Sequence, residues 1–324
     1  MKAVLCTAYG PPENLVLGDV EPLRPGRGQV VVSVKACGVN FPDTLIIQGL
    51  YQFKPSPPFS PGSEVAGIVK EVGAGVESVK PGDRVIAFSA YGGFAEEVLA
   101  EADGLIPMPA ALDFDTAASF VMTYGTGIHA LKDRAHLRPG ETLLVLGAAG
   151  GIGLAAVEIG KTMGAQVIAA ASSSEKLAIC RQHGADDTIN YSTEDVKERV
   201  KALTGGHGVD VIVDPVGGAY SESALRSMAW NGRFLIIGFT SGDIPRIPLN
   251  VPLLKGCSIV GVFWGSFAVR DPQHNQENLR DLLGWIQAGK LNPRISARYP
   301  LERAADALND ILQRKVTGKT VLVV

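Results

Sequence analysis

The strongest constraint on the fold is a regular alternation of apolar runs and helix-like segments between residues 142 and 265. The runs lie at 142–147, 166–171, 187–191, 209–218, 233–239 and 257–265. The segments between them have helical spacing, and two of them end at a glycine, Gly164 and Gly184. Continuous apolar runs are typical of strands that are buried on both faces of a parallel sheet. The alternation therefore predicts an α/β domain with a doubly wound parallel sheet.

The chain before this region has a different pattern. Short strand-like runs such as 29–39 and 64–73 are separated by turn signals, which predicts a β-rich domain. A chain of 324 residues also exceeds the usual size of one domain. We expect a β-rich domain over residues 1–120 that is completed by 268–324, and a nucleotide-binding domain over 121–267.

Composition excludes several classes of protein. The chain is 46% hydrophobic and 19% charged, with a net charge of −3, so no basic excess indicates binding to nucleic acid or to a membrane surface. The four cysteines are scattered and form no CxxC pair, which favours a reducing compartment over a disulfide framework or a structural zinc site. No run reaches the roughly 18 apolar residues of a membrane span, and the N-terminus lacks an apolar signal core. We expect a cytoplasmic protein.

A glycine motif follows the first apolar run of the parallel region. In LLVLGAAGGIGLAA, Gly147, Gly150 and Gly153 stand between an expected strand and an expected helix. In that context backbone N–H groups and the helix dipole can face a pyrophosphate that no side chain keeps away. The alternative is that these glycines only allow a tight turn to pack.

The residues after the second strand bear on which nucleotide binds. An NAD site places a carboxylate there, about 20 residues after the glycines, to bind the ribose hydroxyls. This chain has Ser172, Ser173 and Ser174, with Lys176 close behind. Hydroxyls and an ammonium suit a 2′-phosphate, which a carboxylate would repel, so the pattern favours NADPH. The alternative is that Lys176 is a solvated helix residue.

Taken together, the motifs of the whole chain resemble those of one family. They are CGVNFPD, QGLY, PGSEVAGIV, VKPGDRV, YGTGIHAL, GAAGGIG, SSSEK, INY, DPVGG and GKTVLVV. The chain resembles the zinc-free quinone oxidoreductases, which include zeta-crystallin, among the medium-chain dehydrogenases/reductases. The resemblance implies a GroES-like β-rich catalytic domain and a Rossmann domain that binds NADPH.

The resemblance also shows where metal ligands are missing. Zinc alcohol dehydrogenases share the layout, but they have Cys where this chain has Asn40 and His where it has Ser63, whereas Glu64 remains. Amide and hydroxyl groups are poor zinc ligands, so we expect no metal. We expect Cys37 to be a buried small residue.

Three residues of the first domain are candidates for catalysis by this resemblance. Asn40 resembles an asparagine beside the nicotinamide and can donate to a carbonyl oxygen; the alternative is a turn residue. Asp43 resembles an acid of the same loop, where holding the loop is as good an explanation as catalysis. Tyr51 stands where related enoyl-thioester reductases carry a tyrosine that aids protonation. Its alternative role is to line the cleft.

The resemblance implies a larger set of cofactor contacts, each of which has packing or surface exposure as its alternative. They are Asn40, Thr126, Ala149, Gly150, Gly151, Ile152, Ser172, Ser173, Lys176, Tyr191, Gly238, Phe239, Val262, Phe263, Trp264 and Lys319.

Three functions fit these expectations. The first is NADPH-dependent, zinc-independent reduction of quinones in a cleft between the domains. The second is reduction of a carbon–carbon double bond in enones or enoyl thioesters, with Tyr51 assisting protonation. The third is a non-enzymatic, nucleotide-bound structural or RNA-binding role, against which the net charge counts. We also expect a homodimer through the apolar edge strand within 257–265.

Overall fold

The computed structural model describes residues 1–324, and they form two compact units. The first unit combines Met1–Met122 with Pro293–Val324, and the second is Thr123–Asn292. Residues 268–292, which we expected in the first domain, lie in the second unit. Their helix α10 (Pro272–Gln287) is tied to that unit by side-chain hydrogen bonds, such as that from Asn278 to Asp133.

The first unit is built on a mostly antiparallel sheet with the strand order β14-β15-β3-β4-β5-β7, and β6 also pairs with β3. A separate antiparallel pair is formed by β1 (Lys2–Cys6) and β2 (Leu15–Asp19). The strands of the larger sheet are β3 (Gln29–Val39), β4 (Glu64–Val72), β5 (Arg84–Phe88), β6 (Glu97–Glu101), β7 (Ile106–Pro107), β14 (Ile295–Pro300) and β15 (Lys319–Val323). The helices of this unit are α1 (Phe41–Ile46), α2 (Phe114–Ala117) and α11 (Ala304–Leu312).

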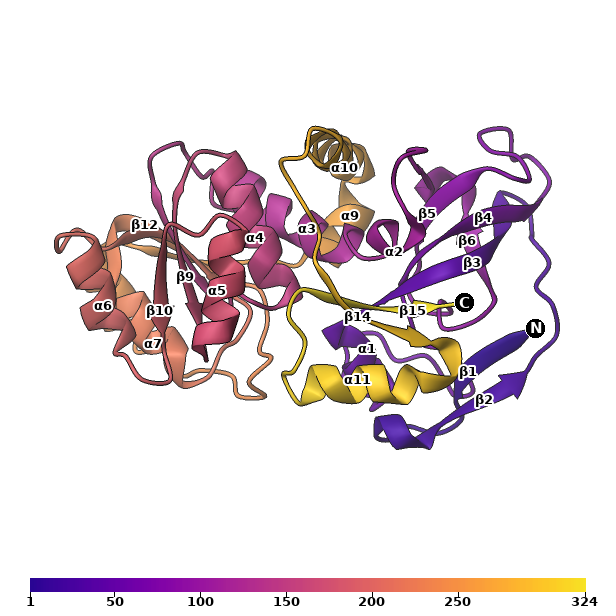
Figure 1. Ribbon diagram of the computed structural model, residues 1–324, viewed down its shortest axis with the longest axis horizontal. Coiled ribbons are helices and arrows are strands. Elements are labelled where there is room, and N and C mark those ends of the chain that lie inside the picture. The colour runs from indigo at the N-terminus through magenta and orange to yellow at the C-terminus, as the bar shows by residue number, and fades with distance from the viewer. The chain divides into compact units, whose positions relative to one another are not determined.

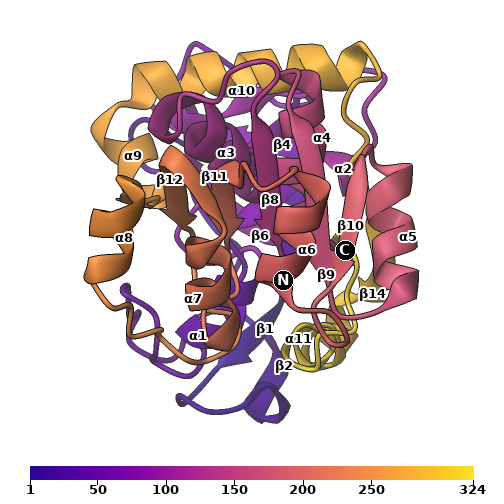
Figure 2. The same ribbon diagram turned by 90° about the vertical axis from the view of Figure 1, so that its left-hand side faces the viewer.

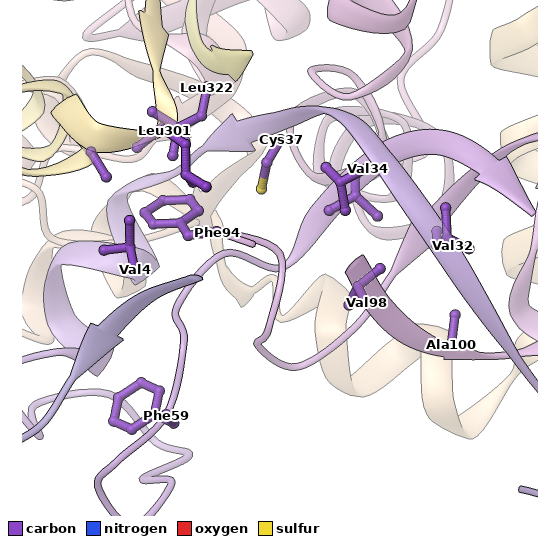
Figure 3. Close-up of a cluster of buried hydrophobic side chains, with 14 of the residues drawn as sticks. Val4, Val32, Val34, Cys37, Phe59, Phe94, Val98, Ala100, Leu301 and Leu322 are labelled. Carbon is purple, nitrogen blue, oxygen red and sulfur yellow. The ribbon is translucent and has the colours of Figure 1, made fainter. Parts of the chain in front are cut away.

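Apolar side chains of several strands meet in one core. Valines of β3 and β4 pack with Phe94 and with Leu301 and Leu322 from the C-terminal segment. Figure 3 shows Cys37 in this group of side chains, beside Phe94 and Val34. The core therefore joins the two ends of the chain within the first unit.

The second unit is a parallel sheet with the strand order β10-β9-β8-β11-β12-β13. The strands are β8 (Thr142–Leu146), β9 (Gln166–Ala171), β10 (Asp187–Asn190), β11 (Val209–Asp214), β12 (Met228–Ile236) and β13 (Ser258–Gly261). The helices are α3 (Val121–Ile128), which continues as a π-helical segment His129–Arg134, α4 (Gly151–Thr162), α5 (Ser174–Gln182), α6 (Val196–Leu203), α7 (Ala219–Arg226), α8 (Asn250–Lys255), α9 (Trp264–Arg270) and α10. This is the doubly wound arrangement that the sequence predicted.

Helices cover both faces of the parallel sheet. Helices α4 and α5 lie on one face and α6 and α7 on the other (Figure 1). Figure 2 looks onto the face that α6 and α7 cover. The strand order reverses between β8 and β11, so the loops that follow these two strands diverge at the carboxyl edge of the sheet. Ligands of such sheets bind at that place.

None of the helices is long and apolar enough to cross a membrane.

Candidate functional site

Three strand ends of the first unit bring polar residues together. Glu64 is the first residue of β4 and Lys319 the first of β15, and both strands run antiparallel to β3. In the registers, Gly38 of β3 is opposite Glu64, and Val39 is opposite Thr320. Asn40 follows directly after β3. The sheet therefore places Asn40, Glu64 and Lys319 at one end of three neighbouring strands.

These side chains form a buried hydrogen-bonded group. The Lys319 ammonium donates to Asn40 Oδ1 and, at 3.2 Å, to Glu64 Oε2. Asn40 Nδ2 donates to Glu64 Oε2 at 3.1 Å and to the Gly38 carbonyl at 3.3 Å. The Met122 N–H donates to Glu64 Oε1 at 3.1 Å. Both oxygens of the buried Glu64 carboxylate thus have partners, as a charge without water requires.

Gly38 makes room for this group. A Cβ atom at this position would lie 2.0 Å from the Ala118 carbonyl oxygen and 2.9 Å from Glu64 Oε2. Any larger residue at position 38 would displace the backbone or the carboxylate.

Asp43 lies on α1, which begins directly after Asn40. Its carboxyl group is buried and accepts a hydrogen bond of 2.7 Å from the Asn40 N–H. Burial raises the pKa of Asp43 to about 7; the Asn40 N–H and the Lys319 charge act against this rise, and the Glu64 charge adds to it. Asp43 is therefore a group that changes its protonation near neutral pH.

Tyr51 is the third predicted catalytic residue. Its ring is partly buried against the core of the first unit, and its hydroxyl has no hydrogen-bond partner within the protein. Burial raises the pKa of the phenol, and the nearby charge of Asp43 adds to this effect. The phenol stays protonated at neutral pH and is available as a donor. Catalytic roles for Asn40, Asp43 and Tyr51 remain predictions.

The residues of this group do not suit a metal ion. The Lys319 ammonium already lies against the oxygens of Asn40 and Glu64 and would repel a second cation. Cys37 is buried in the core, and burial holds the pKa of its thiol well above the usual value, which disfavours the thiolate that binds metals. No group of three or more His, Cys, Asp or Glu side chains is arranged to hold a metal ion.

In the second unit, the glycines between β8 and α4 are required for different reasons. A Cβ at Gly147 would lie 2.7 Å from Val216 Cγ2, and its φ of +58° also favours glycine. A Cβ at Gly153 would lie 2.3 Å from the Gly147 carbonyl oxygen. Packing therefore explains these two. At Gly150, the N-cap of α4, a Cβ would meet only the Gly147 carbonyl oxygen, at 3.4 Å. Its absent side chain fits the close approach of a ligand to the backbone.

The segment after β9 carries hydroxyl groups, and the carboxylate of Glu175, in the first turn of α5, is hydrogen-bonded to the Ser173 side chain. Ser173 caps α5 by accepting a hydrogen bond from the Lys176 N–H, and the Ser172 carbonyl accepts one from the Ser192 hydroxyl. The ring of Tyr191 packs against that of Tyr220, with 4.4 Å between centroids. Sequence reasoning did not find Tyr220, because its helix α7 is distant in the chain from Tyr191.

Sequence reasoning also missed the role of Asp214 in the turn after β11. One carboxylate oxygen of Asp214 accepts hydrogen bonds from the Val216 and Gly217 N–H groups at 2.8 and 2.9 Å, and the other accepts one of 2.5 Å from the Ser221 hydroxyl. Asp214 thereby fixes the loop beside the glycine motif. The DPVGG motif carried this signal, because an acid before a Pro and a glycine pair is typical of such turns.

The remaining predicted cofactor residues lie in the same unit. Trp264 is buried against Gly125, and its indole N–H donates to Asn275 Oδ1 at 2.9 Å. The Val262 N–H donates to the Ile236 carbonyl, whereas the Phe263 side chain is exposed. The Gly238 N–H donates to the Asp214 carbonyl, and the Phe239 carbonyl accepts from the Gly242 N–H. The other predicted cofactor residues of this unit are Thr126, Ala149, Gly151 and Ile152. Contacts of all these residues with a cofactor remain predictions.

The raised pKa of Asp43 predicts a pH dependence of stability. Between about pH 4 and pH 7 the folded protein holds a proton on Asp43 that the unfolded chain has lost, so stability falls as the pH rises through this range. We expect wild type to lose on the order of 2 kcal/mol more free energy of unfolding than Asp43→Asn between pH 5 and pH 8. Urea unfolding at both pH values measures the difference. The same pH dependence in both proteins would contradict the assigned titration.

Comparisons with known proteins agree with both units. Residues 26–110 match the family model described as alcohol dehydrogenase GroES-like domain, and residues 151–287 match the one described as zinc-binding dehydrogenase. A quinone oxidoreductase-like protein 2 homolog of Nematostella vectensis is 45% identical over 99% of this chain and 88% of its own length.

Two solved structures are similar over the whole chain. Escherichia coli quinone oxidoreductase complexed with NADPH has a TM-score of 0.94 and 31% identity, covering 100% of both chains. A protein described as an NAD-dependent alcohol dehydrogenase has a TM-score of 0.92 and 32% identity, also covering 100% of both chains. With a GroES-like unit and a parallel nucleotide-binding unit matched end to end by such relatives, the chain belongs to the quinone oxidoreductase family of the medium-chain dehydrogenases/reductases.

Proposed function

We propose that this protein is an NADPH-dependent quinone reductase. The observation that carries the proposal is the polar group at the strand ends of the first unit, where a lysine ammonium contacts both Asn40 and Glu64. A site of this kind has no Lewis acid with which to polarise a simple ketone or an alcohol. It suits an acceptor that is already activated, such as a quinone. The names of the relatives support the same substrate class.

The second unit supplies the residues that would hold NADPH. The backbone at Gly150 and the N-terminus of α4 suit the pyrophosphate, and Ser172, Ser173 and Lys176 suit the 2′-phosphate. The NADPH-bound Escherichia coli relative supports this choice of nucleotide. When bound, NADPH supplies a hydride, and the balanced reaction is quinone + NADPH + H⁺ → hydroquinone + NADP⁺.

The first unit supplies orientation and a donor. The Tyr51 phenol stays protonated, which supports a role as donor of a hydrogen bond or a proton to a reduced acceptor. Because a quinone is activated without such help, we assign Tyr51 a supporting role in its reduction.

A second candidate function rests on the same tyrosine. Reduction of an enone or enoyl thioester leaves an enolate that needs a proton, and the Tyr51 phenol suits that step. The two functions differ in how strongly turnover depends on the Tyr51 hydroxyl.

A panel of acceptors tests the proposal. NADPH oxidation is followed at 340 nm with an ortho-quinone, a para-quinone, a short enal and an enoyl-CoA, for wild type and for Tyr51→Phe, with NADH as the competing donor. We expect turnover of quinones with NADPH preferred over NADH, and a loss of about tenfold or less in Tyr51→Phe. Absence of quinone turnover at every pH would reject the proposal. Enal or enoyl-CoA turnover that collapses in Tyr51→Phe would establish the second function.

We further propose that two copies of the chain pair through β13. This strand is at the edge of the parallel sheet and has a partner on one side only, β12. Around it, Leu249, Leu253 and Leu254 at helix α8 are 78%, 77% and 74% exposed. An apolar edge of this kind is suited to pairing with a second copy about a two-fold axis.

Light scattering measures this association. We expect a mass of about twice 34.1 kDa for wild type and a monomer for the double variant Leu253→Glu/Ile259→Lys. Leu50→Lys is the matched control, because Leu50 is equally an exposed leucine but lies in the first unit. A monomeric wild type would contradict the proposal.

A cytoplasmic location is also a proposal. All four cysteines are free thiols, which suits a reducing compartment. Cell fractionation followed by immunoblotting would check it; recovery in an oxidising compartment would contradict it.

A further inference from the structure

We propose that Lys319 is a positioning residue, whose buried ammonium is the counter-ion of Glu64 and holds the Asn40 side-chain amide in one orientation. The kinetic part of this inference rests on the proposed function. The structural part does not.

The burial of Lys319 shows that its charge interacts with groups inside the first unit and not with solvent. The side chains of Lys319 and Glu64 are 4% and 0% exposed, and their charged atoms are 3.2 Å apart. A lysine that binds a phosphate from solution keeps its ammonium accessible, whereas this one is directed at Glu64 and Asn40. The position at the start of β15 fixes this direction, since that strand is paired with β3 along its length.

The charges around Lys319 make its ammonium necessary. The buried acids near it are Glu64 from β4 and Asp43 from α1, and the other titratable groups of this region, the Cys37 thiol and the Tyr51 phenol, are neutral at pH 7. Lys319 is the cation that contacts Glu64, and its charge also acts on Asp43. Removing it would leave Glu64 as a buried charge without a counter-ion, which is far more costly than removing an exposed pair.

The ammonium also decides which way the Asn40 amide points. An ammonium has only donors, so the Asn40 atom that faces it must be the oxygen. The NH₂ group then points the other way, where Glu64 Oε2 and the Gly38 carbonyl each accept one of its hydrogens. Lys319 therefore binds the oxygen of the Asn40 amide, and Glu64 binds its NH₂ group.

This orientation limits what Asn40 can do. Both amide hydrogens are used inside the protein, so donation to a substrate carbonyl would require one of these bonds to break. The remaining capacity is a lone pair on Oδ1, which accepts hydrogen bonds. We therefore assign Asn40 the role of a fixed acceptor and wall of the site, with Lys319 holding it in place.

The first test compares Lys319→Met with Lys35→Met, an exposed lysine of β3 that serves as the control. We expect Lys319→Met to lower kcat for the para-quinone by roughly 100-fold, as misplacement of a positioning group does, while the Kd for NADPH changes by less than about threefold. Lys35→Met should behave as wild type. A rise in the Kd for NADPH with an unchanged kcat would make Lys319 a cofactor contact and overturn the proposal.

The double variant Lys319→Met/Glu64→Gln separates positioning from stability. It removes both charges, so it should regain much of the stability that Lys319→Met loses, and it stays informative if the single variant fails to fold. The Asn40 oxygen still lacks its donor, so we expect kcat to stay low. A double variant that regains wild-type kcat together with its stability would show a purely structural role and overturn the proposal.

A measurement without turnover distinguishes failure of this inference from failure of the proposed function. In protein labelled with ¹⁵N-asparagine, the Asn40 side-chain NH₂ signals are identified by their loss in Asn40→Asp. We expect slow hydrogen exchange for this NH₂ group in wild type and in Lys35→Met, and fast exchange in the double variant. Fast exchange in wild type, or unchanged slow exchange in the double variant, would overturn the inference, whatever acceptor the enzyme reduces.

Discussion

The first unit depends on one buried interaction, the contact of the Lys319 ammonium with Glu64 and Asn40. It joins residues 255 positions apart in the sequence and lies where three strands end. The same contact balances the charge of a fully buried carboxylate, and Asn40 also donates its backbone N–H to Asp43 at the start of α1. Fold and site therefore share one set of hydrogen bonds, and few of these residues can change alone.

In the second unit, the backbone at the N-terminus of α4 is left with little side-chain cover. Gly147 and Gly153 let the turn after β8 pack tightly, and Asp214 accepts hydrogen bonds from the backbone of the neighbouring loop. What remains at Gly150 is a helix N-terminus with little side-chain cover. An anion can approach such a surface. The second unit thus offers backbone N–H groups at a helix N-terminus, and the first unit offers a buried polar group.

Local signals predicted much of this architecture. Continuous apolar runs identified the parallel strands, and Gly164 and Gly184, at φ of +86° and +103°, do follow the ends of α4 and α5. The predicted element boundaries were wrong where tertiary packing decides where a strand begins. The apolar run of the fifth strand starts at residue 233, yet β12 begins at Met228, because its residues pair with β11 across an irregular register.

The candidate site shows the same limit. The family resemblance pointed to Asn40, Asp43 and Tyr51, whose catalytic roles remain predictions. The sequence could not show that Lys319 lies against Asn40, since only the pairing of β15 with β3 brings them together. Nor could it show that Glu64 is the partner of both, although a retained acid without its metal was a hint that another cation takes that place.

The most direct test of this account is the rate of para-quinone reduction by NADPH before and after dialysis against a strong chelator, with the zinc content measured on the same samples. The account predicts an unchanged rate and no stoichiometric zinc, because the Lys319 ammonium is the cation of the site. A rate that is lost with the metal and restored by zinc would contradict it.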